Sequence, residues 1–143
     1  MIDFKKIAIA GVAGTLAVDV VGFVLTGTFW DIPSLLAGKL QVPFALGALL
    51  HYVIGSTLTF IYAAVYPLLP GGRWARATLY ASAETVLGVY LFMFPLLGAG
   101  AFGLALGPLV PVISLIRHLA FALVLGGFFP VTEAREIRSP AAV

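Results

Sequence analysis

The sequence predicts an all-α membrane protein with four transmembrane helices in one bundle. Hydrophobic residues make up 62% of its 143 residues and charged residues only 10%, whereas a soluble domain has roughly 45–50% and about 25%. Residues 40–72 and 85–116 contain no Asp, Glu, Lys or Arg. A soluble chain of this length would bury too small a fraction of its surface to hide so many apolar side chains. The composition therefore excludes a soluble enzyme, a disordered regulator and a nucleic-acid binder.

Four segments have the length and composition of membrane spans. A helix needs about 20 mainly apolar residues to cross the hydrocarbon core. The predicted spans are residues 7–29, 44–66, 75–97 and 109–130, each bound taken as approximate. Each span must be helical, because no water is present at membrane depth to satisfy its backbone groups. We expect one domain over residues 1–130 and a short hydrophilic tail over 131–143.

The basic residues predict the orientation. Four spans place both chain ends on the same side of the membrane, and that side would carry Lys5, Lys6, Arg73, Arg76, Arg135 and Arg138. The other side would carry only Lys39. Because cytoplasmic loops are enriched in Lys and Arg, we predict a bacterial inner-membrane protein with both termini in the cytoplasm.

Five ionisable residues fall inside the predicted spans: Asp19, His51, Glu84, Arg117 and His118. A charged residue at mid-membrane costs roughly 2.5–3.5 kcal/mol on insertion scales, so each one should face protein. Small and polar residues at helical spacing flank them, for example Gly47, Gly55 and Thr59 around the first histidine. Such faces form contacts between membrane helices. We expect these residues to gather as one polar cluster in the bundle interior.

The spacing of these residues indicates an internal repeat. The two histidines are 67 positions apart, and Asp19 and Glu84 are 65 positions apart. These nearly equal offsets predict two tandem helix pairs, which is the parallel-repeat arrangement seen in some transporters. In that arrangement His51 and His118 would project toward the centre from related helices.

Several short motifs over most of residues 8–130 resemble a family of four-helix bacterial membrane proteins of unknown function. The motifs are DIP at 31–33 followed by Leu35 and Leu36, HYVIG at 51–55 with Tyr62, FPLLGAGAFG at 94–103, GP at 107–108, and SLIRH at 114–118 with Leu125 and Gly126. The resemblance implies the fold and the membrane location, and it implies no activity. Arg117 departs from the family pattern, which has an apolar or small residue beside the histidine.

The intramembrane cluster allows several interpretations. Its members can simply satisfy one another through hydrogen bonds and an ion pair between helices. A haem b held by His51 and His118 is the sharpest alternative, because haem iron takes axial imidazoles, and Arg117 would then meet a propionate. A non-haem metal with two histidines and two carboxylates is another, although the Glu-x-x-His pairs of di-iron bundles are missing. A proton or ion path through the same residues is the last.

The connection over residues 95–108 has no polar side chain. Its candidate contact residues are Leu96, Leu97, Phe102, Leu104 and Leu106. Contiguous exposed apolar surface usually marks a protein or membrane contact, although this loop can also fold back on its own helices. The segment over residues 30–43 lies on the same side and can form an interfacial helix.

These features predict a non-enzymatic accessory or packing subunit of a larger membrane assembly. Its partners would be membrane lipids and other integral membrane subunits, with no nucleic acid. The chain has no cysteine, which excludes disulfides, iron–sulfur clusters and a cysteine nucleophile, and no catalytic motif is present. The alternative function is a ligand-binding or transport module that uses the intramembrane cluster.

Overall fold

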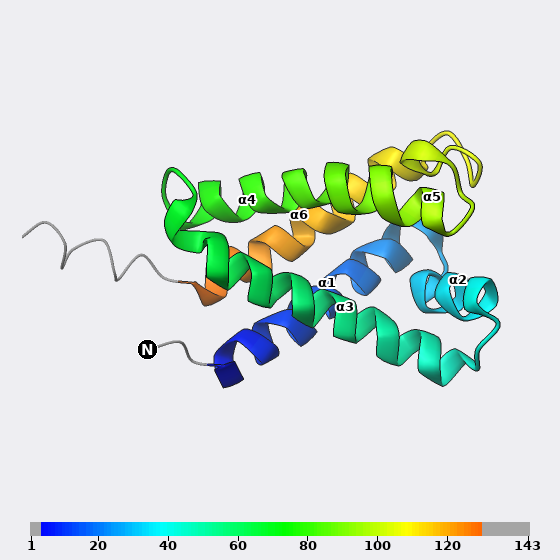
Figure 1. The fold of residues 1–143 in the computed structure, drawn as a ribbon, viewed down its shortest axis with the longest axis horizontal. Helices are drawn as coiled ribbons and strands as arrows, with labels where there is room; N and C mark the ends of the chain where they lie inside the picture. Colours follow the sequence, from blue (N-terminus) through cyan, green and yellow to red (C-terminus); the bar gives the residue numbers. More distant parts are fainter. Residues whose placement is uncertain (1–3, 130–143) are drawn as a thin grey trace, which may run out of the picture.

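The computed structural model describes residues 4–129, and every regular element within them is a helix (Figure 1). Four helical segments are long and apolar enough to cross a membrane: Phe4–Thr26, Phe44–Leu68, Arg73–Leu96 and Val110–Phe128. They coincide with the predicted spans to within a few residues, so the predicted all-α fold with four spans is confirmed. The predicted tail, 131–143, lies outside the described residues.

The first two spans are separated by a short helix. Helix α1 (Phe4–Thr26) is followed by α2 (Asp31–Leu40) and then by α3 (Phe44–Val65), which ends in the 3₁₀ turn η1 (Tyr66–Leu68). Trp30 and Gln41 flank α2 and have left-handed backbone angles, with φ of 59° and 53°. These two sharp turns let ten residues of helix fit between the ends of α1 and α3.

The third span changes its helix type halfway along. Helix α4 (Arg73–Glu84) continues without a break into the π-helix η2 (Thr85–Met93) and the short helix α5 (Phe94–Leu96). A loop containing the 3₁₀ turn η3 (Ala101–Gly103) then leads to α6 (Val110–Phe128). A π-helix of this length is rare, and such segments often occur at functional sites.

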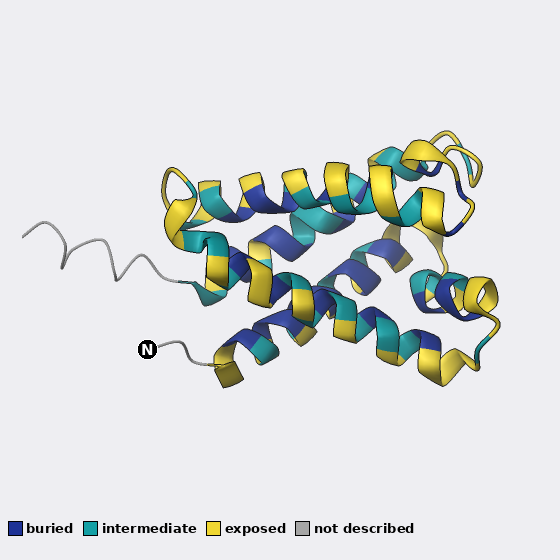
Figure 2. Cartoon of the chain, in the orientation of Figure 1, coloured by how far each residue is buried: buried dark blue, intermediate teal, exposed yellow. Residues whose placement is uncertain are grey.

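The spans pack in the order α3, α1, α6, α4. Helix α1 packs against α3 on one side and α6 on the other, and α6 also packs against α4. Glycines allow this close approach: a Cβ atom on Gly11 would lie 2.7 Å from Cα of Ser56. Buried residues line the inward faces of the helices, whereas the outward faces are exposed (Figure 2). The exposed side chains include many large apolar ones, as expected for helices surrounded by lipid.

The two helix pairs of the predicted repeat both form, but the contacts between the pairs are not symmetric. Helix α1 packs on α3 and α4 packs on α6, as two tandem pairs require. Between the pairs, however, α1 packs along α6, whereas α3 and α4 meet through long side chains. The Tyr80 hydroxyl donates to the Leu58 carbonyl at 2.6 Å, and its ring contacts Tyr62. The bundle is therefore asymmetric, which leaves a space between α3 and the π-helix.

The ends of the spans opposite the N-terminus, which are the predicted outer ends, are covered by α2 and the loop around η3 (Figure 1). Helix α2 is held on α3 because Gly47 has no side chain: a Cβ there would lie 2.8 Å from that of Ala37. The loop folds back on the bundle, with Ala99 buried and the Phe102 ring against Tyr90. Leu97, predicted to contact a partner, is only 9% exposed, so this residue is excluded from any outer contact surface.

Candidate functional site

The five predicted intramembrane residues form three separate acid–base pairs rather than one cluster. Asp19 pairs with His51, Glu84 pairs with His118, and Arg117 pairs with Asp31. Each pair joins two different helices. All five side chains face protein rather than lipid, because each is mostly or fully buried. The reason for the separation is that Arg117 and His118 are neighbours in sequence and therefore point to different faces of α6.

The Asp19 carboxylate uses both of its oxygens. Nε2 of His51 lies 3.0 Å from Oδ1, and the Tyr52 hydroxyl donates to Oδ2 at 3.0 Å. Asp19 is 1% exposed. Two consecutive residues of α3 thus hold one carboxylate of α1, and the packing of Gly55 against Thr15 one turn away keeps these helices close.

Arg117 forms a bidentate pair with Asp31, the first residue of α2. Its Nη1 and Nη2 donate to the two carboxylate oxygens at 3.0 and 2.6 Å. The guanidinium lies against Gly22 of α1, where a Cβ would be 2.6 Å from Cζ. Planar pairing of this kind is geometrically specific. The pair neutralises the charge of Arg117 and attaches α2 to α6.

The Glu84–His118 pair shares one proton. Nδ1 of His118 lies 2.7 Å from the Ser114 carbonyl oxygen, and Nδ1 must carry a hydrogen because a carbonyl oxygen only accepts. Nε2 lies 3.3 Å from Oε2 of Glu84. An Nε2 lone pair facing an ionised carboxylate would be repulsive, so a proton lies on one of these two atoms. Oε2 is buried but has no hydrogen bond of normal geometry.

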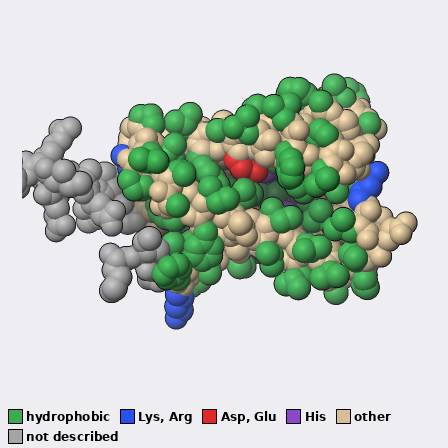
Figure 3. Space-filling view, in the orientation of Figure 1, with side chains coloured by type: hydrophobic (Ala, Val, Ile, Leu, Met, Phe, Trp, Pro, Cys, Tyr) green, Lys and Arg blue, Asp and Glu red, His purple; other side chains and the backbone are tan. Residues whose placement is uncertain are grey.

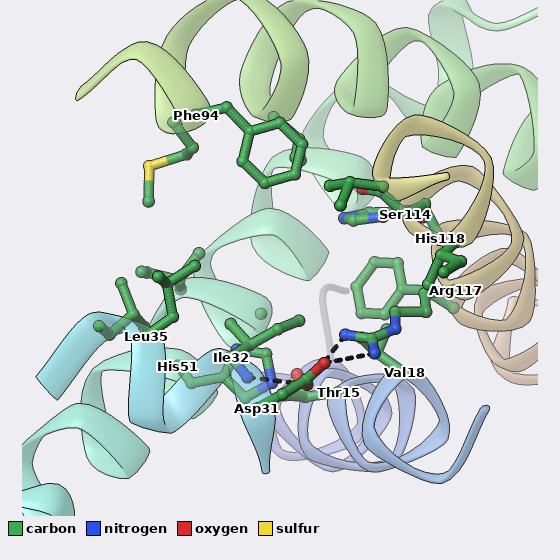
Figure 4. A pocket seen from close by; sticks show the side chains of 18 of the residues that line it. Thr15, Val18, Asp31, Ile32, Leu35, His51, Phe94, Ser114, Arg117 and His118 are labelled. Atoms are coloured by element: carbon green, nitrogen blue, oxygen red, sulfur yellow. Dashed lines mark hydrogen bonds and ion pairs between the residues drawn. The ribbon is translucent and has the colours of Figure 1, made fainter. Parts of the chain in front are cut away.

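A cavity of about 390 Å³ lies between α1, α2, α3, α6 and the π-helix. Its walls are mainly apolar, and its polar lining comes from all three pairs: Asp31, His51, Glu84, Arg117 and His118, with Ser114 and Thr15 nearby. Figure 4 shows His118 and Ser114 on one wall, His51 on another, and the Asp31–Arg117 pair below them. In Figure 3 the surface is hollowed between α3 and the α4–η2 helix, and acidic and histidine side chains are visible in the hollow.

The π-helix begins directly after Glu84 and forms part of the cavity wall through Val89 and Met93. The Thr85 hydroxyl donates to the Ala81 carbonyl at 2.6 Å, a bond that often bends helices. The Glu84 carboxyl lies along its own helix, because a Cβ on Gly88 would be 3.2 Å from Oε1. The carboxyl therefore lies beside the cavity at the junction between the two helix types.

The haem and metal interpretations do not fit this arrangement. A haem would need Nε2 of both histidines directed at one iron, but each Nε2 faces the carboxylate of its own pair. Arg117 is bound to Asp31 instead of being available to a propionate. Over residues 4–129, no three His, Asp or Glu side chains come together in a way that could hold a metal ion.

Sequence reasoning missed two members of the site, Asp31 and Tyr52. Asp31 appears in the sequence analysis only as part of the DIP motif. The need of the intramembrane Arg117 for an acidic partner was the signal that could have identified it. Tyr52 follows His51 directly, and this adjacency was the available signal. The loop residues Leu96, Phe102, Leu104 and Leu106 are exposed as predicted, at the outer end of the bundle.

Comparison with known proteins identifies no relative of this chain: no family model, no curated protein and no solved structure matches it. The function is therefore inferred from the cavity and the three acid–base pairs that border it.

Proposed function

We propose that this protein is a non-enzymatic membrane module that binds a lipid-soluble ligand in the cavity between α3 and the π-helix. The single observation that carries this proposal is the cavity itself: about 390 Å³ and mainly apolar, with a few hydrogen-bonding groups on its walls. Ligand sites are typically apolar hollows with a few positioned polar groups.

The place of the cavity supports a ligand that arrives from the bilayer. Glu84 and His118 lie near the middle of their spans, and the hollow is on a face covered with apolar side chains (Figure 3). Water-soluble ligands would have to cross half of the membrane to reach it. A lipid-soluble molecule diffusing in the bilayer reaches the opening directly.

Photolabelling in lipid nanodiscs tests the proposal. A long-chain alkyl diazirine should label cavity-wall residues saturably, as mapped by peptide mass spectrometry. Val89→Trp fills the cavity and should abolish saturable labelling. Its matched control is Leu87→Trp on the same π-helix, because Leu87 is 64% exposed and lies away from the cavity. Non-saturable labelling that is equal in both variants and confined to lipid-facing positions would contradict the proposal.

An accessory role in a larger membrane assembly is the second candidate. It is supported by the exposed apolar side chains of the outer loop, with Leu96 66% and Leu104 59% exposed. Leu104→Asp should release the protein from co-purifying membrane subunits while the bundle stays inserted. The matched control is Leu97→Ala, which alters a buried residue of the same loop. If the Leu104→Asp variant retains the same subunits, the loop is not a docking surface.

The orientation is also part of the proposal. We expect both chain ends in the cytoplasm of a bacterial inner membrane, because Arg73 and Arg76 lie at the same end of the bundle as Lys5 and Lys6, with Lys39 at the other end. A periplasm-only reporter fused to either end should be inactive. The same reporter inserted after Gly38, where an added Cβ would meet no atom within 4 Å, should be active.

A further inference from the structure

We infer that the ligand of this cavity is an uncharged single-chain lipid with a terminal hydroxyl group, a long-chain alcohol, whose hydroxyl binds at Glu84 and His118 and whose chain runs toward α2. This inference rests on the proposed binding function and assigns the chemical class and the orientation of the ligand.

The charges around the cavity exclude a charged headgroup. Arg117 is neutralised by the two oxygens of Asp31. The other two pairs each combine one carboxyl group with one imidazole. A charged headgroup would therefore be buried without a counterion, which is strongly unfavourable. The mid-membrane position gives the same result, because charged headgroups remain at the membrane surface.

The hydrogen-bonding groups favour a hydroxyl. Oε2 of Glu84 is a buried acceptor with no hydrogen bond of normal geometry, and leaving such an acceptor unpaired is unfavourable. A hydroxyl can donate to this oxygen and can also accept from Nε2 of His118 when that atom carries the shared proton. One small group thus satisfies both members of the pair in either protonation state.

A second hollow provides the path for the chain. It has a volume of about 400 Å³ and lies between α2, α3 and the end of the third span. Four side chains line both hollows: Leu36, Ile54, Met93 and Leu97. Apart from Lys39 at its outer end, every residue that lines the second hollow is apolar. A hydrocarbon chain starting at Glu84 would pass Met93 and continue toward Leu40 and Leu50.

The experiment compares headgroups on a constant chain. Hexadecanol, hexadecanoate, hexadecyl phosphate and hexadecylamine compete with the alkyl diazirine in nanodiscs containing the full chain. Hexadecanol should compete at least about tenfold better than any charged compound, the scale of one lost hydrogen bond to a charged group. Decanol should be weaker than hexadecanol, because its chain does not fill the second hollow.

Two variants distinguish the binding of the ligand's hydroxyl group from the binding of its hydrocarbon chain. Glu84→Gln should lower the apparent affinity for hexadecanol about tenfold. Lys5→Gln, at an exposed residue that lines neither hollow, should leave it unchanged. Leu50→Trp narrows only the second hollow, so it should reduce the advantage of hexadecanol over decanol. The melting temperature of each variant is measured in parallel, and the ranking of competitors on the unmodified chain decides the headgroup if Glu84→Gln folds poorly.

Three results would overturn the inference in distinguishable ways. Stronger competition by hexadecanoate or hexadecyl phosphate, lost in Lys39→Gln, would place an anionic headgroup at Lys39 and leave the binding function intact. Equal competition by all four compounds would show that the cavity does not recognise a headgroup. No competition by any compound, together with non-saturable labelling, would reject the proposed function itself.

Discussion

The two histidine–carboxylate pairs have the same residue types at matching repeat positions, yet their environments differ. In the Asp19–His51 pair both carboxylate oxygens are engaged and the acid is fully buried. In the Glu84–His118 pair one oxygen has no hydrogen bond of normal geometry, and the acid borders the cavity. Both pairs join two helices, but only the Glu84–His118 pair retains a hydrogen-bonding atom that a ligand can use.

A single residue explains much of this difference. The 67-residue offset that relates His51 to His118 also relates Tyr52 to Leu119. The first pair therefore has a hydroxyl donor that completes the carboxylate, and the second pair has an apolar side chain at the same position. A histidine–carboxylate pair in a membrane bundle therefore has a purely structural role when a third group donates a hydrogen bond to the second carboxylate oxygen. Without that third group, one carboxylate oxygen has no hydrogen bond of normal geometry.

The largest expected effect comes from removing the acid of the first pair. Asp19→Ala leaves the His51 imidazole and the Tyr52 hydroxyl buried without a partner and should cost about 3–5 kcal/mol of unfolding free energy. Glu84→Ala should cost less, about 1–3 kcal/mol, because its carboxyl already lies beside a cavity. Reversible unfolding in mixed micelles measures both. Equal losses would mean that the two pairs have the same structural role.

The contact between α1 and α3 should be the next most sensitive feature. A Cβ on Gly55 would overlap Oγ1 of Thr15, so Gly55→Ala should lower the unfolding free energy by about 1–3 kcal/mol. Thr15→Ala removes that oxygen and should restore most of the loss in the double variant. Failure of this rescue would show that the helices separate for another reason. The same unfolding assay reports the outcome.

Tyr52→Phe should make the first pair resemble the second. It removes one hydrogen bond to Asp19 and should cost about 1 kcal/mol. Leu119→Phe serves as a control for a change of size at the matching position. An unchanged stability would indicate that the hydroxyl contributes nothing to the pair.

The smallest expected effect is at Gly88. A Cβ there would lie 3.2 Å from Oε1 of Glu84, so Gly88→Ala should displace the carboxyl by a few tenths of an ångström. Stability should change by less than about 1 kcal/mol, whereas the affinity for hexadecanol should fall about two- to fivefold. Gly127→Ala, at a glycine inside α6 with open space around it, is the control for helix propensity.

The spans were predictable because length and hydropathy determine them directly. The burial of Asp19 and Glu84 was predictable as well, since lipid offers no partner for a carboxyl group. The pairing was not, because helical periodicity places residues on a face but does not say which neighbouring helix that face meets. The π-helix also escaped prediction: residues 85–93 have an ordinary apolar composition, and only the packing around Glu84 reveals the altered winding.

The asymmetry between the two helix pairs could not be predicted from the sequence either. The repeat offsets predicted related helix pairs, and both pairs form. Helix α2 has no counterpart after the third span, where a loop with the turn η3 stands instead. Because Asp31 of α2 binds Arg117, α2 covers one side of the cavity only. The ten-residue helix α2 thus distinguishes the first helix pair from the second.

The Arg117–Asp31 pair has a consequence for the biosynthesis of the protein. A ribosome delivers the spans in order, so the arginine of α6 enters the bilayer after Asp31, 86 positions earlier, has already been inserted. An isolated arginine at mid-span opposes insertion by roughly 2.5–3.5 kcal/mol. Because Asp31 offers this arginine a partner, we expect α6 expressed alone to insert less efficiently than α6 co-expressed with residues 1–43, which contain α1 and α2.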